Sequence, residues 1–451
     1  MNPKYPLIAA AVAAAVGASY ANAATTVPTI TSAASPSASL VMAGSSAAES
    51  SVANALATDL CGGSGNMLTV QSAGGSKNFY AFSCYSTPTN ITGVPSNTLT
   101  TVYYRTEGGS VVGALPLIPP GHNVLRLNLS NSSCSSSGNS GTCTVTGVTS
   151  VNGTNDSWSG AVVEGSIDLG VTDVEPGKLI GADYPSNYST SIFGNASTNQ
   201  AALPGLSHVP AVQQVFGIAV NTTGLKLATA GTVNLSKEAV ANIYANKYTD
   251  WSSVPDALTG AAVSSGPAGI VHVDREPGSG TRTSANIYFF NYPCAGTTAI
   301  QNTSGSEVLN YSTGDDLNLA NSTPGSITYA SIDNLLPPKN TSYTNLVLAT
   351  INGVTPSTLA AAAGEYDFWF EATLVPNAAT TGTSANLSTW LQTDLPRLGA
   401  APLAADINVI PNVAGNTGAV PLTSRVGTSA TIYINPFTRQ GNSCNVPVET
   451  N

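Results

Sequence analysis

The residues of this 451-residue chain that are best suited to bind an anion lie in one short turn. Arg275 is followed closely by Gly278-Ser279-Gly280-Thr281. The arginine offers a planar fork of N–H donors that matches a tetrahedral oxyanion. Ser279 and Thr281 add hydroxyls, and the two glycines let the backbone approach a ligand closely. The alternative is a surface turn with a solvated arginine, which we disfavour because the whole chain has only 14 Lys and Arg.

A second turn has the same character. Gly44-Ser45-Ser46 follows the apolar stretch 39–43 and precedes a helical pattern in which Val52, Leu56 and Leu60 recur at four-residue spacing. Backbone N–H groups and hydroxyls at the start of a helix stabilise an anion. For this serine pair taken alone, an ordinary helix cap is the simpler interpretation.

Both turns connect a predicted strand to a predicted helix. The Arg275 turn follows a strand expected over 268–273 and precedes a helix in which Ala285, Tyr288 and Phe289 share one face. Strand-like and helix-like stretches alternate along the chain, which favours an α/β architecture. Within this pattern we expect His272 to pack inside its strand.

Asp173 stands at the end of another predicted strand, 167–170. A carboxylate inside an anion site is explicable if the ligand carries a proton. It accepts a hydrogen bond from HPO₄²⁻ or H₂PO₄⁻ but repels unprotonated sulfate. The alternative interpretation is a residue that caps a turn.

These segments together resemble a known family. The run 275–281 resembles the Arg-x-x-Gly-Ser-Gly-Thr loop of the phosphate-binding proteins that serve ABC-type phosphate uptake, a branch of the type 2 periplasmic binding proteins. Five further segments resemble that family in the same order along the chain, namely 43–46, 170–173, 225–251, 325–329 and 351–366. The resemblance covers most of residues 38–375 and implies an α/β fold of two lobes, with a hinge crossed twice and a ligand cleft between the lobes.

The resemblance also implies which residues contact the ligand. Carried over position by position, they are Ser46, Ala47, Asp173, Arg275, Ser279, Gly280 and Thr281. The chain departs from the family at 105–109, where Arg-Thr-Glu-Gly-Gly replaces Gly-Ser-Ser-Gly-Gly, and at Pro277, where the family often has an acid. Thr106 is the candidate to replace the missing hydroxyl. Glu107 would repel a dianion if it pointed inward, so either it turns away, paired with Arg105, or the ligand is not phosphate.

The same resemblance gives the expected domains. Lobe one comprises about 24–213 plus 365–451, and lobe two about 214–364. The second hinge crossing carries the aromatic run 366–370, and the excursion over 127–160 is expected to be a stapled hairpin off lobe one. Residues 1–23 read as a secretory signal peptide, with Lys4, an apolar run and an Ala-Asn-Ala cleavage site. We expect an exported protein, periplasmic or extracellular.

Six cysteines in an exported chain favour disulfides. Their order favours Cys61 with Cys84 and Cys134 with Cys143. Cys294 with Cys444 would then remain, although six cysteines allow 15 connectivities.

The composition excludes several classes of protein. Apolar residues make up 42% of the chain and charged residues only 8%, with a net charge of −10. A coiled coil, a charge-driven disordered chain and a nucleic-acid binder are excluded, and no basic surface is left for anionic lipid. We therefore expect no nucleic-acid partner and no stable membrane insertion.

The three histidines and the paired carboxylates Asp315-Asp316, which we expect to be solvated, form no hydrolase or metal motif. The expectation is a non-enzymatic monomer without cofactor or metal that binds inorganic phosphate and delivers it to an ABC permease. Two alternatives stay open. One is a secreted scavenger or surface protein of this fold with another ligand, and the other is a phosphoester hydrolase on this fold.

Overall fold

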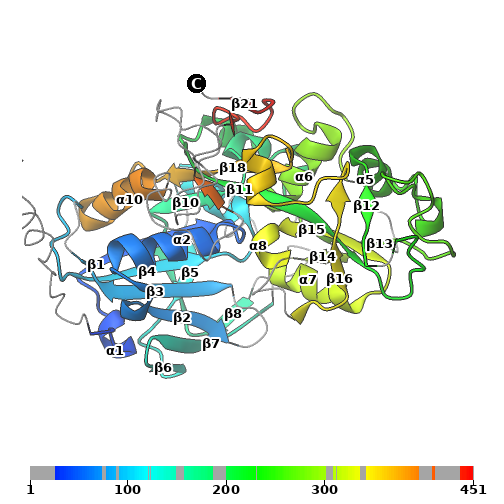
Figure 1. Ribbon diagram of the computed structural model, residues 1–451. Coiled ribbons are helices and arrows are strands. Elements are labelled where there is room, and N and C mark those ends of the chain that lie inside the picture. Colours follow the sequence, from blue (N-terminus) through cyan, green and yellow to red (C-terminus); the bar gives the residue numbers. More distant parts are fainter. Residues whose placement is uncertain are drawn as a thin grey trace, which may run out of the picture.

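A mixed α/β fold is built on one large sheet (Figure 1). The computed structural model describes residues 26–73, 78–87, 91–119, 121, 123–148, 157–185, 200–229, 231–300, 308–310, 312–335, 342–395, 409–411 and 437–449. The predicted signal peptide lies outside these ranges. Within them, the α/β class that the sequence indicates is confirmed.

The main sheet has 15 strands in the described residues. Twelve follow the order β14-β13-β15-β11-β18-β10-β1-β4-β3-β2-β7-β6, while β16 and β19 pair with β11, and β8 pairs with β7. The strands of this sheet are β1 Ala38–Gly44, β2 Leu68–Ala73, β3 Phe79–Tyr85, β4 Leu99–Arg105, β6 Cys134–Ser137, β7 Ser140–Val148, β8 Ser157–Gly160, β10 Leu169–Thr172, β11 Val209–Asn221, β13 Val271–Arg275, β14 Val308–Asn310, β15 Ser326–Ser331, β16 Leu346–Leu348, β18 Trp369–Pro376 and β19 Val409–Pro411.

Three strand pairs stand outside the main sheet in the described residues. They are β5 Asn123–Leu127 with β9 Val162–Ser166, β12 Asn234–Leu235 with β17 Thr350–Ile351, and β20 Phe437–Thr438 with β21 Val448–Glu449.

Helices cover the sheet. The α-helices are α1 Ile30–Ala33, α2 Glu49–Ala55, α5 Lys237–Tyr244, α6 Gly280–Phe290, α7 Thr313–Ser322, α8 Ile332–Leu335, α9 Thr358–Ala362 and α10 Gly382–Asp394. A π-helical turn, η1 Leu56–Leu60, continues α2, and 3-10 turns occur at η2 Ser64–Asn66, η3 Ser110–Gly113, η4 Leu115–Leu117, η5 Pro176–Lys178, η6 Gly181–Asp183, η7 Leu203–Gly205 and η8 Trp251–Ser253. No helix in the described residues is both long and apolar enough to cross a bilayer.

Strand β1 is buried on both faces, as a central strand of a layered sheet must be. Leu40 and Met42 point to the side where α2, η1 and α10 pack, whereas Val41 and Ala43 belong to the core on the other side. The helical spacing of Val52, Leu56 and Leu60 is confirmed, since all three are buried. β1 runs parallel to both neighbours, β4 and β10.

Strand β11 belongs to both halves of the molecule. Its residues 209–215 pair with β18, and its residues 216–220 pair with β15. In Figure 1 the blue to cyan strands β1–β4 lie at the left, α5, β12, β13 and β16 lie at the right, and β11 and β18 lie between. The chain thus passes twice through the middle of the sheet, while the expected lobe limits at 213/214 and 364/365 stay a prediction.

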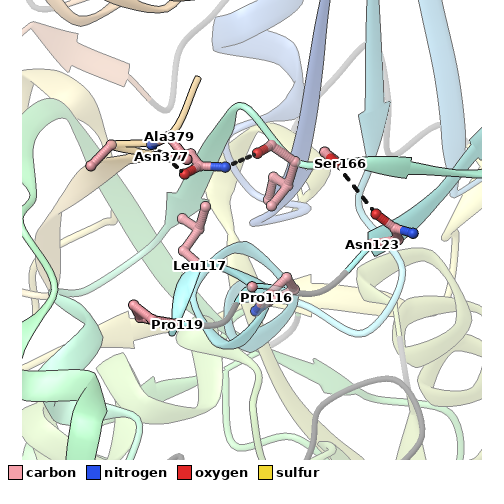
Figure 2. Close-up of a pocket in the computed structure, with 10 residues that line it drawn as sticks. Pro116, Leu117, Pro119, Asn123, Ser166, Asn377 and Ala379 are labelled. Atoms are coloured by element: carbon pink, nitrogen blue, oxygen red, sulfur yellow. Dashed lines mark hydrogen bonds between the residues drawn. The ribbon is translucent and has the colours of Figure 1, made fainter. Parts of the chain in front are cut away.

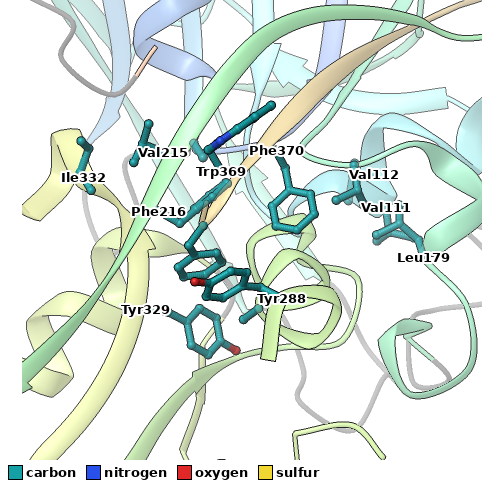
Figure 3. Close-up of a cluster of buried hydrophobic side chains, with 14 of the residues drawn as sticks. Val111, Val112, Leu179, Val215, Phe216, Tyr288, Tyr329, Ile332, Trp369 and Phe370 are labelled. Atoms are coloured by element: carbon teal, nitrogen blue, oxygen red, sulfur yellow. The ribbon is translucent and has the colours of Figure 1, made fainter. Parts of the chain in front are cut away.

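Aromatic side chains fill the region where β11, β18 and α6 meet (Figure 3). Tyr288 of α6 stacks on Phe368 with ring centroids 4.6 Å apart, and Phe216 of β11 lies 5.6 Å from Phe368. The aromatic run 366–370 was expected in the core at the hinge, and four of its five residues are buried. This packing fixes α6, and therefore its first turn, against the central strands.

The structure contains three disulfides, Cys61–Cys84, Cys134–Cys143 and Cys294–Cys444. The first two are the pairs that the order of the cysteines favoured, and the third is the pair that then remained. Cys134–Cys143 staples the antiparallel hairpin β6–β7, as expected within 127–160, and β7 also pairs with β2, so this hairpin extends the main sheet. Cys294–Cys444 ties the C-terminal segment 437–449 to the chain after α6.

Three local predictions differ from the structure. The strand expected over 167–170 is β10, which covers Leu169–Thr172. β13 begins at Val271, so 268–270 precede the strand. Asp316 was expected in solvent, but it is fully buried because α7 turns it inward toward Asn310 and Thr328. His272 is buried in β13, as expected, and burial lowers its pKa to about 4.

Candidate anion-binding site

The two turns singled out in the sequence both precede helices in the structure. Ser45 and Ser46 lie between β1 and α2, and Gly280 and Thr281 open α6. Ser279 is the N-cap of α6, where its side chain accepts a hydrogen bond from the Arg282 amide. The first turn of α6, where the helix dipole favours negative charge, lies beside Asp173, which accepts a hydrogen bond from Thr281.

Asp173, just beyond the end of β10, links the two turns. Its carboxylate accepts hydrogen bonds from the hydroxyl of Ser45 and, at 3.1 Å, from the hydroxyl of Thr281. Its backbone amide donates to Ser110 Oγ at 3.0 Å. We call these four residues the Asp173 cluster. All four are buried.

Burial raises the pKa of Asp173, while the Ser45 and Thr281 hydroxyls and the positive charge of Arg275 act in the opposite direction. The ionised carboxylate only accepts hydrogen bonds. Asp173 therefore holds the protons of Ser45 and Thr281, and the remaining lone pairs of those oxygens are acceptors. This side of the site suits a ligand that carries a proton.

Arg275, the last residue of β13, anchors the other side. The residue is 1% exposed, and its guanidinium Nη1 donates to Thr313 Oγ1 at 2.9 Å while Nε donates to the Asn310 carbonyl at 3.3 Å. Thr313 Oγ1 lies 3.0 Å from Ser46 Oγ. Arg275, Asn310, Thr313 and Ser46 form the Arg275 cluster, which brings cationic and hydroxyl donors next to the Asp173 cluster.

Gly280, the first residue of α6, packs closely against Ser110 and Asp173. A Cβ at this position would lie 2.2 Å from Ser110 Oγ and 2.7 Å from Asp173 Cβ. No other amino acid fits at the start of α6 without displacing the Asp173 cluster. This explains physically why a glycine stands between the two hydroxyl residues of the turn.

The departures at 105–109 have a structural answer. Glu107 is buried and paired with Arg105, whose Nη2 lies 2.6 Å from the Glu107 carboxylate. The pairing with Arg105 that the first possibility included is thus present. The Thr106 hydroxyl donates its proton to the Asn78 carbonyl at 3.3 Å, so this proton is engaged in a turn contact just after β4.

The structure thus brings together Ser46, Asp173, Arg275, Gly280 and Thr281. Ala47 is buried in the turn after Ser46, and Ser279 serves as the helix cap. The sequence prediction missed Ser45, Ser110 and Thr313. Ser45 was in view in the same turn as Ser46. Thr313 follows Ser312, whose side chain accepts from the Asp315 amide, so the Ser-x-x-Asp spacing of a helix start was its available signal.

A pocket of about 480 Å³ lies away from these residues (Figure 2). Its polar lining includes Asn377, whose amide donates to the Ile167 carbonyl and whose oxygen accepts from the Ala379 amide. These bonds close the loop after β18, so Asn377 has a structural role. Within the described residues, no group of three or more His, Cys, Asp or Glu could hold a metal ion.

A family model described as "PBP superfamily domain" matches residues 188–408. Among solved structures, the chain is similar to a putative phosphate ABC transporter substrate-binding protein with bound phosphate from Clostridium perfringens, with 11% identity, a TM-score of 0.44, and coverage of 82% of this chain and 99% of that one. It is also similar to a phosphate-binding protein from Stenotrophomonas maltophilia, with 12% identity, a TM-score of 0.41, and coverage of 83% and 87%. PstS from Borrelia burgdorferi is similar as well, with 13% identity, a TM-score of 0.33, and coverage of 81% of this chain and 93% of that one.

A comparison with curated proteins finds no match. The family model covers β11 through α10, which includes Arg275, the first turn of α6 and Thr313. Residues 188–408 therefore match a PBP superfamily domain, in agreement with the resemblance that the sequence motifs indicated.

Proposed function

We propose that this chain is an exported solute-binding protein that holds inorganic phosphate between the Asp173 cluster and the Arg275 cluster. The observation that best supports this proposal is the opposite charge of the two neighbouring clusters. One side places a buried carboxylate among hydroxyl oxygens, and the other presents a buried guanidinium. Hydrogen phosphate matches both, since it has oxygens to accept and a proton to donate.

Sulfate fits this arrangement poorly. It carries no proton at neutral pH, so it would meet the Asp173 carboxylate with repulsion alone. The buried ion pair of Arg105 and Glu107 supports the phosphate reading, because Glu107 is neutralised by its neighbour and need not oppose a dianion.

The proposed site joins residues on the two sides of the central strands β11 and β18. Ser46 and Asp173 belong to the part expected as lobe one, and Arg275, Thr281 and Thr313 to the part expected as lobe two. Closure of an interlobe cleft would therefore assemble the site. We further propose that the protein acts in binding and delivery to an ABC-type permease and not as an enzyme.

Calorimetric titration of the mature protein with phosphate tests the proposal. Wild type should bind, and Arg275→Ala should abolish measurable binding, because removing one partner of a buried charge pair costs roughly 2 to 5 kcal/mol. Arg126→Ala is the matched control. That arginine lies over the Tyr103 ring at 4.3 Å, outside both clusters, and its removal should leave the affinity unchanged. Wild type without heat or thermal shift at millimolar phosphate would refute the ligand assignment.

A further inference from the structure

Three polar side chains from separate segments form a continuous chain across the site. Arg275 Nη1 of β13 donates to Thr313 Oγ1 of α7 at 2.9 Å, and Thr313 Oγ1 lies 3.0 Å from Ser46 Oγ in the turn after β1. Thr313 is 5% exposed. Its hydroxyl oxygen contacts both of the other two side chains and so links them.

The charge of Arg275 sets the direction of these hydrogen bonds. A guanidinium has only donors, so the Thr313 oxygen must accept. The positive charge repels the hydroxyl proton of Thr313, which therefore points away from the cation and toward Ser46 Oγ. We infer that Ser46 accepts this proton, which leaves the Ser46 proton to be donated in another direction. Hydrogen bonds linked in series polarise one another in this way.

The neighbouring serine has the opposite arrangement. Ser45 donates its proton to Asp173 and accepts from the Ala48 amide at 3.0 Å. Two adjacent hydroxyls in one turn are thus oriented by two different partners, a carboxylate for Ser45 and a threonine held by an arginine for Ser46.

We propose that Thr313 is a positioning residue of the phosphate site, which transmits the polarisation of Arg275 to Ser46 and makes the Ser46 hydroxyl a donor to the ligand. This inference rests on the proposed function. It adds to the site one residue of α7, Thr313, which lies outside the two turns. The start of α7 is fixed by the Ser312 cap, whose side chain accepts from the Asp315 amide at 3.1 Å, so Thr313 has little freedom to turn away.

The test is a titration of four variants with inorganic phosphate. Thr313→Val keeps the shape of the side chain and removes the hydroxyl, so phosphate affinity should fall at least tenfold. Thr313→Ser keeps the hydroxyl and should stay within about threefold of wild type. Ser46→Ala should lose affinity to a similar degree as Thr313→Val. Because the two residues act in series, the double variant should lose at least threefold less than the product of the single losses.

Unfolding midpoints measured without phosphate show whether each variant is folded. If Thr313→Val does not fold, Thr313→Ala takes its place in the cycle. Thr313→Val with wild-type affinity, or losses that simply multiply with those of Ser46→Ala, would overturn the relay while leaving the proposed function intact. Absence of phosphate binding in wild type would instead overturn the proposed function and, with it, this inference.

Discussion

Replacing Gly280 by alanine tests whether the start of α6 forms the binding site. The added Cβ would lie 2.2 Å from Ser110 Oγ, 2.7 Å from Asp173 Cβ and 2.9 Å from Asp173 Oδ2. Carbon atoms in contact prefer about 3.5 to 4.0 Å, so either α6 or the Asp173 cluster must move by about 1 Å. Overpacking of this kind costs about 1 to 3 kcal/mol. If the displacement falls on groups that hold phosphate, affinity should drop about five- to 150-fold.

Gly314 supplies a matched control. It is the second residue of α7, next to Thr313, and its added Cβ would meet only Ser312 Oγ, at 3.9 Å. Gly314→Ala should therefore bind phosphate as wild type does. Its stability should stay level or rise by up to about 1 kcal/mol, because alanine favours the helix. Calorimetric titration and thermal unfolding of both variants measure the contrast. Wild-type affinity in Gly280→Ala, or equal losses in the two variants, would show that α6 does not begin at the ligand.

Two further predictions concern buried carboxylates. Asp173→Asn should narrow the preference for phosphate over sulfate at least tenfold, because the amide removes the repulsion of sulfate and no longer accepts the protons of both Ser45 and Thr281. Competition titrations at fixed ionic strength measure the ratio of the two affinities. An unchanged ratio would show that Asp173 is a purely structural group. Burial raises the pKa of Asp316 to about 7, so the folded chain binds more protons than the unfolded chain between about pH 4 and 7, and the contribution of Asp316 to the free energy of unfolding falls as the pH rises through that window. Asp316→Asn should flatten this dependence by an amount on the order of 1 to 4 kcal/mol in denaturant titrations at pH 4.5 and 7.5, with part of the slope remaining because Asp183 has a similarly raised pKa of about 7; an unchanged slope would contradict the reasoning.

Local features of the fold could be predicted from the sequence. The apolar stretch before Gly44 lies in β1, and Val52, Leu56 and Leu60 lie in α2 and η1. The turn after Arg275 leads into α6. Each of these depends on residues within a few positions of one another. Periodic apolar residues and turn-forming glycines act over that range, so a sequence pattern is enough to predict them.

The candidate ligand residues were predictable for a similar reason. Arg275, Gly280 and Thr281 lie within seven positions, and a glycine-flanked hydroxyl turn before a helix has a recognisable chemistry. Asp173 was identifiable by its place at the end of a strand. The sequence left open whether Glu107 pairs with Arg105. The structure shows this ion pair, which forms between near neighbours that are buried together.

The sequence by itself indicated the strand–turn–helix units around Ser46 and Arg275, the polar character of both turns and the resemblance to periplasmic binding proteins. The tertiary structure alone decided which hydroxyl serves which partner. Ser45 meets Asp173 across 128 positions, and Ser46 meets Thr313 across 267. It also decided that Asp316 is buried beside Thr328. The physical reason is that proton direction and burial depend on groups supplied by distant strands and helices, and only the packing of the sheet brings those groups within hydrogen-bonding distance.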